Sequence, residues 1–209
     1  MYKIGIILPT RGDREEFLNI AKQYIERQTV KPHIIKIVDF KPKTNDLDIT
    51  MRYRIGYEEI RNQCDIVFFW EDDDWYREDY LEWMISMWNE HGCPKLFGVS
   101  ESHFYHIDEH YIKINHPRRA CMYNTMVRSD LDIMWAVDKY RFMDMVLWNK
   151  HRGVLVNYDE VRSVGIKHGI GMPGSHNHKN FIGWPLHGKL AKEKFVSLIG
   201  EDHKRYASF

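Results

Sequence analysis

The sequence predicts an α/β fold with a mostly parallel central sheet and flanking helices. Three runs of mostly apolar residues, at 4–8, 34–38 and 66–70, are typical of strands buried on both faces. Two segments whose apolar residues have helical spacing, around 13–24 and 51–63, separate these runs along the chain. Strands that alternate with helices are typical of parallel sheets, and this alternation predicts the fold class.

The remaining elements are expected in the following order. Asp13, followed by Glu16 three residues later, is a candidate capping pair for the first helix. A further helix is expected over 77–91. In the second half of the chain, Asp108 and Glu109 lie between two apolar runs and predict a hairpin, so we expect a small antiparallel addition to the sheet. The other expected elements are a strand at 96–100, a helix at 139–152, a strand at 154–156, a long loop at 165–188 and a closing helix near 190–199.

The composition is that of a single domain spanning residues 1–209. A chain of 209 residues with 44% hydrophobic content can bury a core of its own. The 30 Lys and Arg residues balance 30 Asp and Glu residues, so no net field attracts nucleic acid or an acidic membrane, and we expect neither as a partner. Three scattered cysteines are typical of free thiols in a reducing compartment. No apolar stretch is long enough to span a bilayer, and we expect a cytoplasmic protein.

Four consecutive carboxylates, Glu71 to Asp74, directly follow the third apolar run. Such a run is ordinarily a solvated turn, but here it lies between a buried strand and the aromatic pair Trp75 and Tyr76. Ligands of open α/β sheets bind beyond the carboxyl ends of the strands, and the three strand ends bring residues 9–11, Asp39 and the acidic run to one edge. Adjacent carboxylates repel one another unless solvent or a cation neutralises them. We therefore expect a metal site, and oxygen ligands suit Mg²⁺ or Mn²⁺.

Three segments resemble, in this order, the family 2 glycosyltransferases that have the GT-A fold. They are Ile6–Arg11, Gln28–Pro32 leading into Ile37–Asp39, and Phe68–Tyr76, and the resemblance covers about residues 3 to 90. It implies a Rossmann-like domain that binds a nucleoside diphosphate sugar, with a UDP-sugar expected, and that transfers the hexose to a hydroxyl of a carbohydrate or glycoconjugate acceptor. The small size is similar to that of single-domain viral or capsule-type members.

The resemblance assigns roles to residues on the donor side of the site. Pro9, Thr10 and Arg11 would form the turn that holds the nucleoside. Asp39 would accept hydrogen bonds from the base or the ribose, a role that suits a carboxylate at a strand end. Arg52 and Arg54 resemble the basic position that contacts the donor in this family, and Arg52 is the one we assign to it.

The acidic run can supply metal ligands in two registers. Glu71 and Asp73 are the two motif positions in one register, Asp72 and Asp74 in the other, and the sequence does not decide between them. We assign Asp73 and Asp74 to the metal and Asp72 to the donor, with Mn²⁺ or Mg²⁺ bridging the donor phosphates. Some GT-A enzymes use a late histidine as a further ligand, and His168 is the candidate here. The same expected loop also contains His176 and His178.

An inverting transfer needs a carboxylate that takes the proton from the acceptor hydroxyl. In the family this acid lies at the start of a late helix that leads into a basic residue, a glycine and a strand. Asp144, followed by Arg152 and Gly153, matches that arrangement, with Met143 at the position where the family has a glutamate. Asp144 is therefore the expected base, and Asp138 is the reserve.

Two alternatives come from other functional classes. Clustered Asp residues at a strand end also serve metal-dependent phosphoryl chemistry, so a nucleotide-sugar hydrolase or a nucleotidyltransferase is the first alternative. The turn at residues 9–11 and Asp39 speak against it. The second is an inactive nucleotide-sugar-binding module, in which mutation of Asp144 would leave function untouched.

Overall fold

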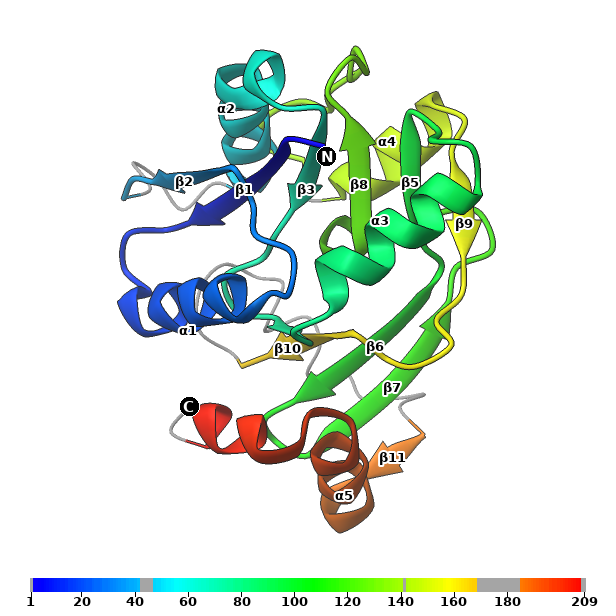
Figure 1. Ribbon diagram of the computed structural model, residues 1–209. Coiled ribbons are helices and arrows are strands. Elements are labelled where there is room, and N and C mark those ends of the chain that lie inside the picture. The colour runs from blue at the N-terminus through cyan, green and yellow to red at the C-terminus, as the bar shows by residue number, and fades with distance from the viewer. Residues whose placement is uncertain (1, 42–46, 141, 169–184, 208–209) are drawn as a thin grey trace.

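Two β-sheets and the helices that cover them make up the structure, a computed structural model that describes residues 2–41, 47–140, 142–168 and 185–207 (Figure 1). The strands of the first sheet are β1 (Ile4–Thr10), β2 (Ile34–Asp39), β3 (Ile66–Phe69), β5 (Leu96–Val99), β8 (Thr125–Arg128) and β9 (Val154–Val156). Their order is β2-β1-β3-β8-β5-β9. Strand β1 pairs in parallel with β2 and β3, and β5 with β9, whereas β8 runs antiparallel to β3 and β5. The predicted α/β class with a mostly parallel sheet is confirmed.

The second sheet lies below the first in Figure 1. Its strands are β4 (Trp75–Tyr76), β6 (Glu101–His106), β7 (His110–Asn115), β10 (Ser163–Lys167) and β11 (Leu186–His187), in the order β11-β7-β6-β10-β4. The β6–β7 hairpin confirms the predicted antiparallel addition. The segment 165–188 was expected to be a loop, and that expectation is wrong for residues 165–167 of β10 and 186–187 of β11. Residues 169–184 of this segment lie outside the described residues. Four of the five β10 residues are buried, so the strand has no polar alternation to reveal it.

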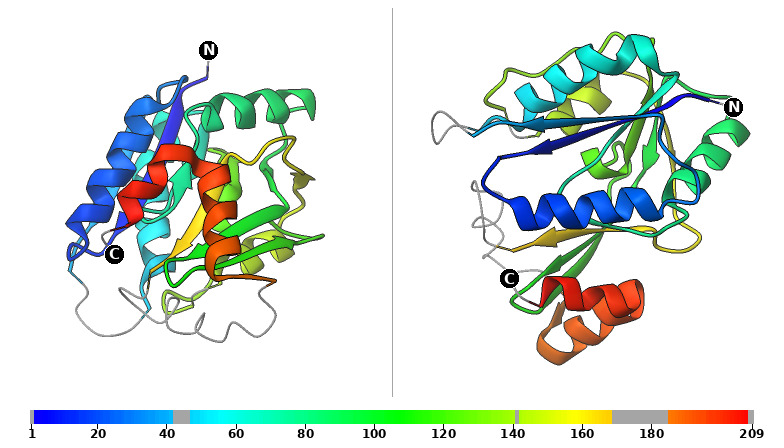
Figure 2. Two further views of the ribbon diagram at one scale, coloured as in Figure 1. Left: turned by 90° about the horizontal axis from the view of Figure 1, so that it is seen from below. Right: turned by 60° about the vertical axis from the view of Figure 1, so that its left-hand side comes forward.

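In the described part of the chain, five α-helices cover the sheets. They are α1 (Glu15–Arg27), α2 (Ile49–Ile60), α3 (Tyr80–Glu90), α4 (Met143–Lys150) and α5 (Gly188–Ile199). Helices α1 and α3 pack in one core on one face of the six-stranded sheet, and α2 and α4 pack in a second core on the other face (Figures 1 and 2). Helix α5 lies against β7 of the second sheet. Each of these helices overlaps one that the sequence predicts.

The start of α1 differs from its prediction. Arg14 occupies the N-cap position, and no side chain caps the helix. Asp13, the expected cap, lies one residue too early and instead pairs with Arg11, with 3.5 Å between its Oδ1 and the arginine Nε. The capping pair of Asp13 and Glu16 is therefore wrong. Arg14, at the N-cap position of α1, points its guanidinium group toward the acidic run and pairs with Asp72.

Two hydrophobic cores hold the central strands from both faces. In β1, Ile6 and Leu8 belong to one core and Ile7 to the other, and all three are fully buried. Phe68 of β3 and Trp70, the residue after β3, belong to the same core as Ile6. Each such side chain contributes about 1.5–3 kcal/mol by leaving water. Burial on both faces explains why these strands appear in the sequence as continuous apolar runs.

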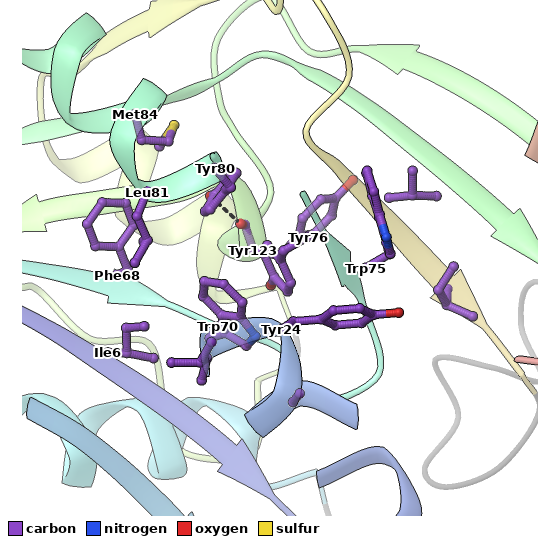
Figure 3. Close-up of a cluster of buried hydrophobic side chains, with 14 of the residues drawn as sticks. Ile6, Tyr24, Phe68, Trp70, Trp75, Tyr76, Tyr80, Leu81, Met84 and Tyr123 are labelled. Atoms are coloured by element: carbon purple, nitrogen blue, oxygen red, sulfur yellow. Dashed lines mark hydrogen bonds between the residues drawn. The ribbon is translucent and has the colours of Figure 1, made fainter. Parts of the chain in front are cut away.

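Aromatic packing fixes the chain on either side of the acidic run. Trp70 stacks on Tyr76 with ring centroids 3.7 Å apart (Figure 3). The Tyr80 hydroxyl donates a hydrogen bond to the carbonyl of Tyr123 at 2.8 Å. The short segment that carries the four carboxylates therefore has both of its ends anchored in the core.

Arg52 ties together the carboxyl ends of β1 and β2. Its guanidinium is 1% exposed and donates hydrogen bonds to the carbonyls of Thr10, Val38 and Phe40. It also pairs with Asp48, one turn earlier, at 2.7 Å. Arg52, the residue expected to contact the donor, lies beneath the ends of β1 and β2, where its buried side chain holds both strands.

Replacing Arg52 by Met should lower the free energy of unfolding by about 3–5 kcal/mol, because the change leaves buried acceptors without a donor. Urea titration measures the effect. Arg54→Met is the matched control: Arg54 lies two residues further along α2, and its pair with Asp138 is more than a third exposed on both sides, so its loss should cost at most about 1 kcal/mol. Equal losses in the two variants would contradict the role of Arg52 in holding the strand ends.

Candidate functional site

The carboxyl ends of β1, β2 and β3 meet at one edge of the first sheet. Thr10 and Asp39, the last residues of β1 and β2, are partners in the strand register. Trp70, just beyond β3, donates its backbone N–H to the carbonyl of Ile7 at 2.9 Å. The acidic run begins at the next residue. The structure thus brings together the three segments that the sequence analysis placed at this edge.

Asp39 offers an open carboxylate at this edge. The residue is exposed, and its side chain forms no hydrogen bond or ion pair with the residues that the structure describes. Gly12 passes close to it with φ +71, and a Cβ atom there would lie 2.8 Å from Asp39 Oδ1. Pro9 and Thr10 are buried in β1, and Arg11 follows them with its side chain 15% exposed. The expected donor-side residues therefore surround one strand end, and Asp39 is the acceptor with free capacity.

Three of the four carboxylates of the acidic run converge. One ligand oxygen from each of Glu71, Asp73 and Asp74 lies within 4.8 Å of the others, and this is the group of metal-ligating side chains found in the described part of the chain. Asp72 is not a member of it. The arrangement combines the two registers that the sequence left open, because it takes Glu71 and Asp73 from one and Asp74 from the other.

Burial disfavours the charges of Asp74 and Glu71. Asp74 is fully buried, its Oδ1 accepts the backbone N–H of Ile166 at 2.8 Å, and its Oδ2 forms no hydrogen bond with the residues that the structure describes. Burial, followed by the charge of Glu71, raises the pKa of Asp74. Burial also raises the pKa of Glu71, against the opposing charge of Lys167. An unpartnered buried oxygen beside other carboxylates fits a divalent cation such as Mg²⁺ or Mn²⁺, which prefers oxygen ligands.

Arg14 joins the other two carboxylates of the run. Its Nη2 donates to Asp72 Oδ1 at 2.6 Å, and its Nη1 to Asp73 Oδ2 at 3.2 Å. His168 Nε2 lies 2.9 Å from the same Oδ2 of Asp73. Burial opposes the charge of Asp73, but the hydrogen bond from His168 and the charge of Arg14 outweigh it and lower the pKa of Asp73 below its ordinary value. Asp73 is therefore the carboxylate of the group that stays ionised.

Lys167 adds a second cation to the cluster. It is the last residue of β10, and its Nζ lies 5.2 Å from the centre of the Phe104 ring. Burial opposes its charge, but the charges of Asp74, Glu71 and Asp73 outweigh burial and raise the pKa of Lys167. Strand β10 thus supplies a positive charge from far along the chain to the carboxylates that follow β3.

The two candidate bases lie in ion pairs. Asp144 lies in the first turn of helix α4, is 7% exposed and pairs with Arg119. Asp138, the reserve, pairs with Arg54 at 2.9 Å.

Sequence reasoning missed two cations of the site and one hydrogen-bond donor. Arg14 was hidden by the expected cap at Asp13, and Lys167 by the expected loop. Tyr53, on α2, donates its hydroxyl to Glu71 Oε1 at 3.3 Å. Arg11 and Arg14 both lie between β1 and α1, and these two basic residues were the available sign that a cation lies close to the acidic run. Two of the late histidines named above, His176 and His178, lie outside the described residues.

Comparison with solved structures gives the fold a name. The chain is similar to S. aureus TarS 1-349 in complex with UDP-GlcNAc, with a TM-score of 0.57 and 11% identity over 99% of this chain and 73% of that one. The complex of the same fragment with UDP gives a TM-score of 0.52 at 12% identity. A structure of longer TarS is matched at a TM-score of 0.52, and this chain covers 41% of it. The GT-A fold expected from the sequence is confirmed.

No protein-family model and no curated protein matches the sequence. None of the described helices is long and apolar enough to cross a membrane.

The buried charge of Asp72 should make the stability of the metal-free protein depend on pH. Burial, followed by the charge of Asp73, raises the pKa of Asp72 from 3.8 to about 7. The folded state therefore binds this proton more tightly than the unfolded state. The resulting stability is fully present below pH 3.8 and is lost as the pH rises through about 7, a contribution of up to about 4 kcal/mol.

Asp72→Asn should remove this part of the pH dependence, as measured by urea unfolding in chelator across that range. Asp132→Asn is the control, because the Asp132 side chain is fully exposed and should leave the slope unchanged. If Asp72→Asn keeps the wild-type slope, the buried charge of Asp72 is not its source.

Proposed function

We propose that the protein is a glycosyltransferase that binds a nucleoside diphosphate sugar, with a UDP-sugar as the expected donor, at the edge where β1, β2 and β3 end. The observation that carries this proposal is the convergence of Glu71, Asp73 and Asp74 at that edge of a GT-A fold. The likeness to TarS, which has been solved with UDP-GlcNAc and with UDP, supports the choice of donor.

The nucleoside would lie over the ends of β1 and β2. Asp39 is exposed there and has unused acceptor capacity, which suits the hydroxyls of a ribose or the N–H groups of a base. Pro9, Thr10 and Arg11 would form the turn beside it. Arg52 supports this surface from below, because it holds the carbonyl groups at both strand ends. Asp72, which is also expected on the donor side, is 2% exposed and paired with Arg14.

Glu71, Asp73 and Asp74 would hold Mn²⁺ or Mg²⁺. When bound, such a cation neutralises the charge that develops on the leaving diphosphate. Burial raises the pKa values of Glu71 and Asp74, so protons compete with a cation for these two groups up to a higher pH than at exposed carboxylates. Metal affinity should therefore rise with pH. His168, expected to be a ligand, would act through its hydrogen bond to Asp73.

Asp144 would serve as the general base of an inverting transfer. The acceptor hydroxyl attacks the anomeric carbon, its proton passes to the carboxylate, and the bond from that carbon to the diphosphate breaks. Arg119 holds the Asp144 carboxylate in one orientation. A cytoplasmic location and a carbohydrate or glycoconjugate acceptor remain part of the proposal.

Asp74→Asn should keep the fold and abolish metal-linked donor binding. The amide retains an oxygen for the N–H of Ile166 and removes a charge that burial disfavours, so the metal-free protein should be as stable as wild type or more so. Thermal shift and calorimetry with UDP and UDP-sugars compare binding in Mn²⁺ with binding in excess chelator.

Wild type should bind the donor more tightly with Mn²⁺, and the variant equally in both conditions. Glu78→Gln, which alters an exposed carboxylate just beyond the run, is the control and should behave as wild type. Equal binding by wild type with Mn²⁺ and with chelator would rule out the metal role.

Asp144→Asn should separate chemistry from binding. The amide cannot accept a proton, so transfer should fall by about a hundredfold to ten-thousandfold while donor affinity is kept. Nucleotide release is measured with and without acceptor, alongside donor binding by calorimetry. Asp138→Asn is the matched control and should transfer normally.

The same assay separates the alternatives. Release that is independent of acceptor would indicate a hydrolase, and donor binding without release in wild type would indicate a binding module. Normal transfer by Asp144→Asn would show that Asp144 is not the general base.

A further inference from the structure

The four carboxylates of the acidic run have two different kinds of surroundings. Glu71, Asp73 and Asp74 converge, whereas Asp72 lies outside the group and is engaged by Arg14 at 2.6 Å. We propose that Arg14 is a positioning residue of the metal site, which uses Asp72 as its anchor and fixes the carboxylate of Asp73 for the cation. This inference rests on the metal-dependent function proposed above.

Hydrogen bonds leave one oxygen of Asp73 for a ligand. Its Oδ2 receives both Nη1 of Arg14 at 3.2 Å and Nε2 of His168 at 2.9 Å. Its Oδ1 receives no hydrogen bond from the residues that the structure describes. Partners of this kind orient a ligating carboxylate and are commonly worth about 10–100-fold in metal affinity. Because both donors bind Oδ2 of Asp73, its Oδ1 is the oxygen that is available to a cation.

The surroundings of Arg14 restrict its guanidinium to this geometry. Its side chain is 14% exposed, and its guanidinium carbon lies 5.8 Å from the centre of the Phe17 ring. The same ring packs against His168 with centroids 4.2 Å apart. Phe17, on the first turns of α1, thus supports both donors to Asp73. The planar fork of an arginine can reach Asp72 and Asp73 together, which the single ammonium of a lysine cannot reproduce.

A counter-ion role and a positioning role of Arg14 predict opposite changes in metal affinity when the residue is replaced. A positive charge beside a cation site repels the cation, so if Arg14 acted only as a counter-ion, its removal would tighten metal binding. If Arg14 positions Asp73, its removal weakens metal binding. A lysine at this position keeps the charge and loses the fork, so the pair of variants separates the two roles.

The test measures Mn²⁺ affinity without donor, by electron paramagnetic resonance of free Mn²⁺, for wild type, Arg14→Lys and Arg14→Met. Both variants should bind Mn²⁺ about 10–100-fold more weakly than wild type. Arg54→Lys and Arg54→Met are matched controls on α2 and should bind as wild type. Melting temperatures of the metal-free proteins establish that each variant is folded at the assay temperature. If Arg14→Met is unfolded at that temperature, the comparison of Arg14→Lys with wild type decides the question.

Wild-type affinity in Arg14→Lys together with tighter binding in Arg14→Met would overturn the positioning role and leave the metal site intact. A lower melting temperature with unchanged Mn²⁺ affinity would also overturn it, because Arg14 would then be only structural. If wild type binds no Mn²⁺, the proposed metal function fails and this inference fails with it. Weaker binding in both Arg14 variants, with normal Arg54 controls, supports the inference.

Discussion

Repulsion among four adjacent carboxylates, held at the end of a strand buried on both faces, is the constraint on which the rest of this structure depends. Trp70 and Tyr76 stack in the core on either side of the run, so the segment cannot move away into solvent. Charges kept out of water need partners, because the cost of leaving them unpaired is several kcal/mol each. Arg14, Lys167 and His168 come from two other parts of the chain to meet that need.

The two sheets share the work of building this site. The first sheet contributes the strand ends, and Arg52 holds the carbonyl groups of β1 and β2 in place. The second sheet contributes β10, which pairs with β4 directly after the acidic run. That pairing brings the N–H of Ile166 to Asp74 and places Lys167 beside the cluster. The antiparallel addition is therefore part of the site.

The pKa values of the carboxyl groups in the cluster shift in opposite directions, because the positive charges lie closer to some of these groups than to others. Asp73 receives Arg14 and His168 directly and stays ionised, whereas Asp74 has an oxygen with no partner and a raised pKa. Protons therefore compete most strongly at Asp74 with the cation proposed for this site.

The sequence was sufficient for the strand and helix alternation. Burial on both faces leaves a local apolar pattern in β1 and β3, and β2 is also mostly apolar, although it is the edge strand and only its Val38 is buried. It was also sufficient for the edge where their ends meet, since parallel strands bring their carboxyl ends together. The antiparallel strand β8 between β3 and β5 escaped prediction, because its four residues carry no pattern that distinguishes them from a loop.

Within the site, the acidic run and Asp39 could be located from the sequence, because each directly follows a recognisable strand. Which carboxylates converge, and which cations meet them, was decided only by the tertiary structure. Asp74 finds its hydrogen-bond donor in Ile166, 92 residues away, and Asp73 finds His168 across 95 residues. Charge neutralisation acts through space, so no local pattern records which distant residue supplies it.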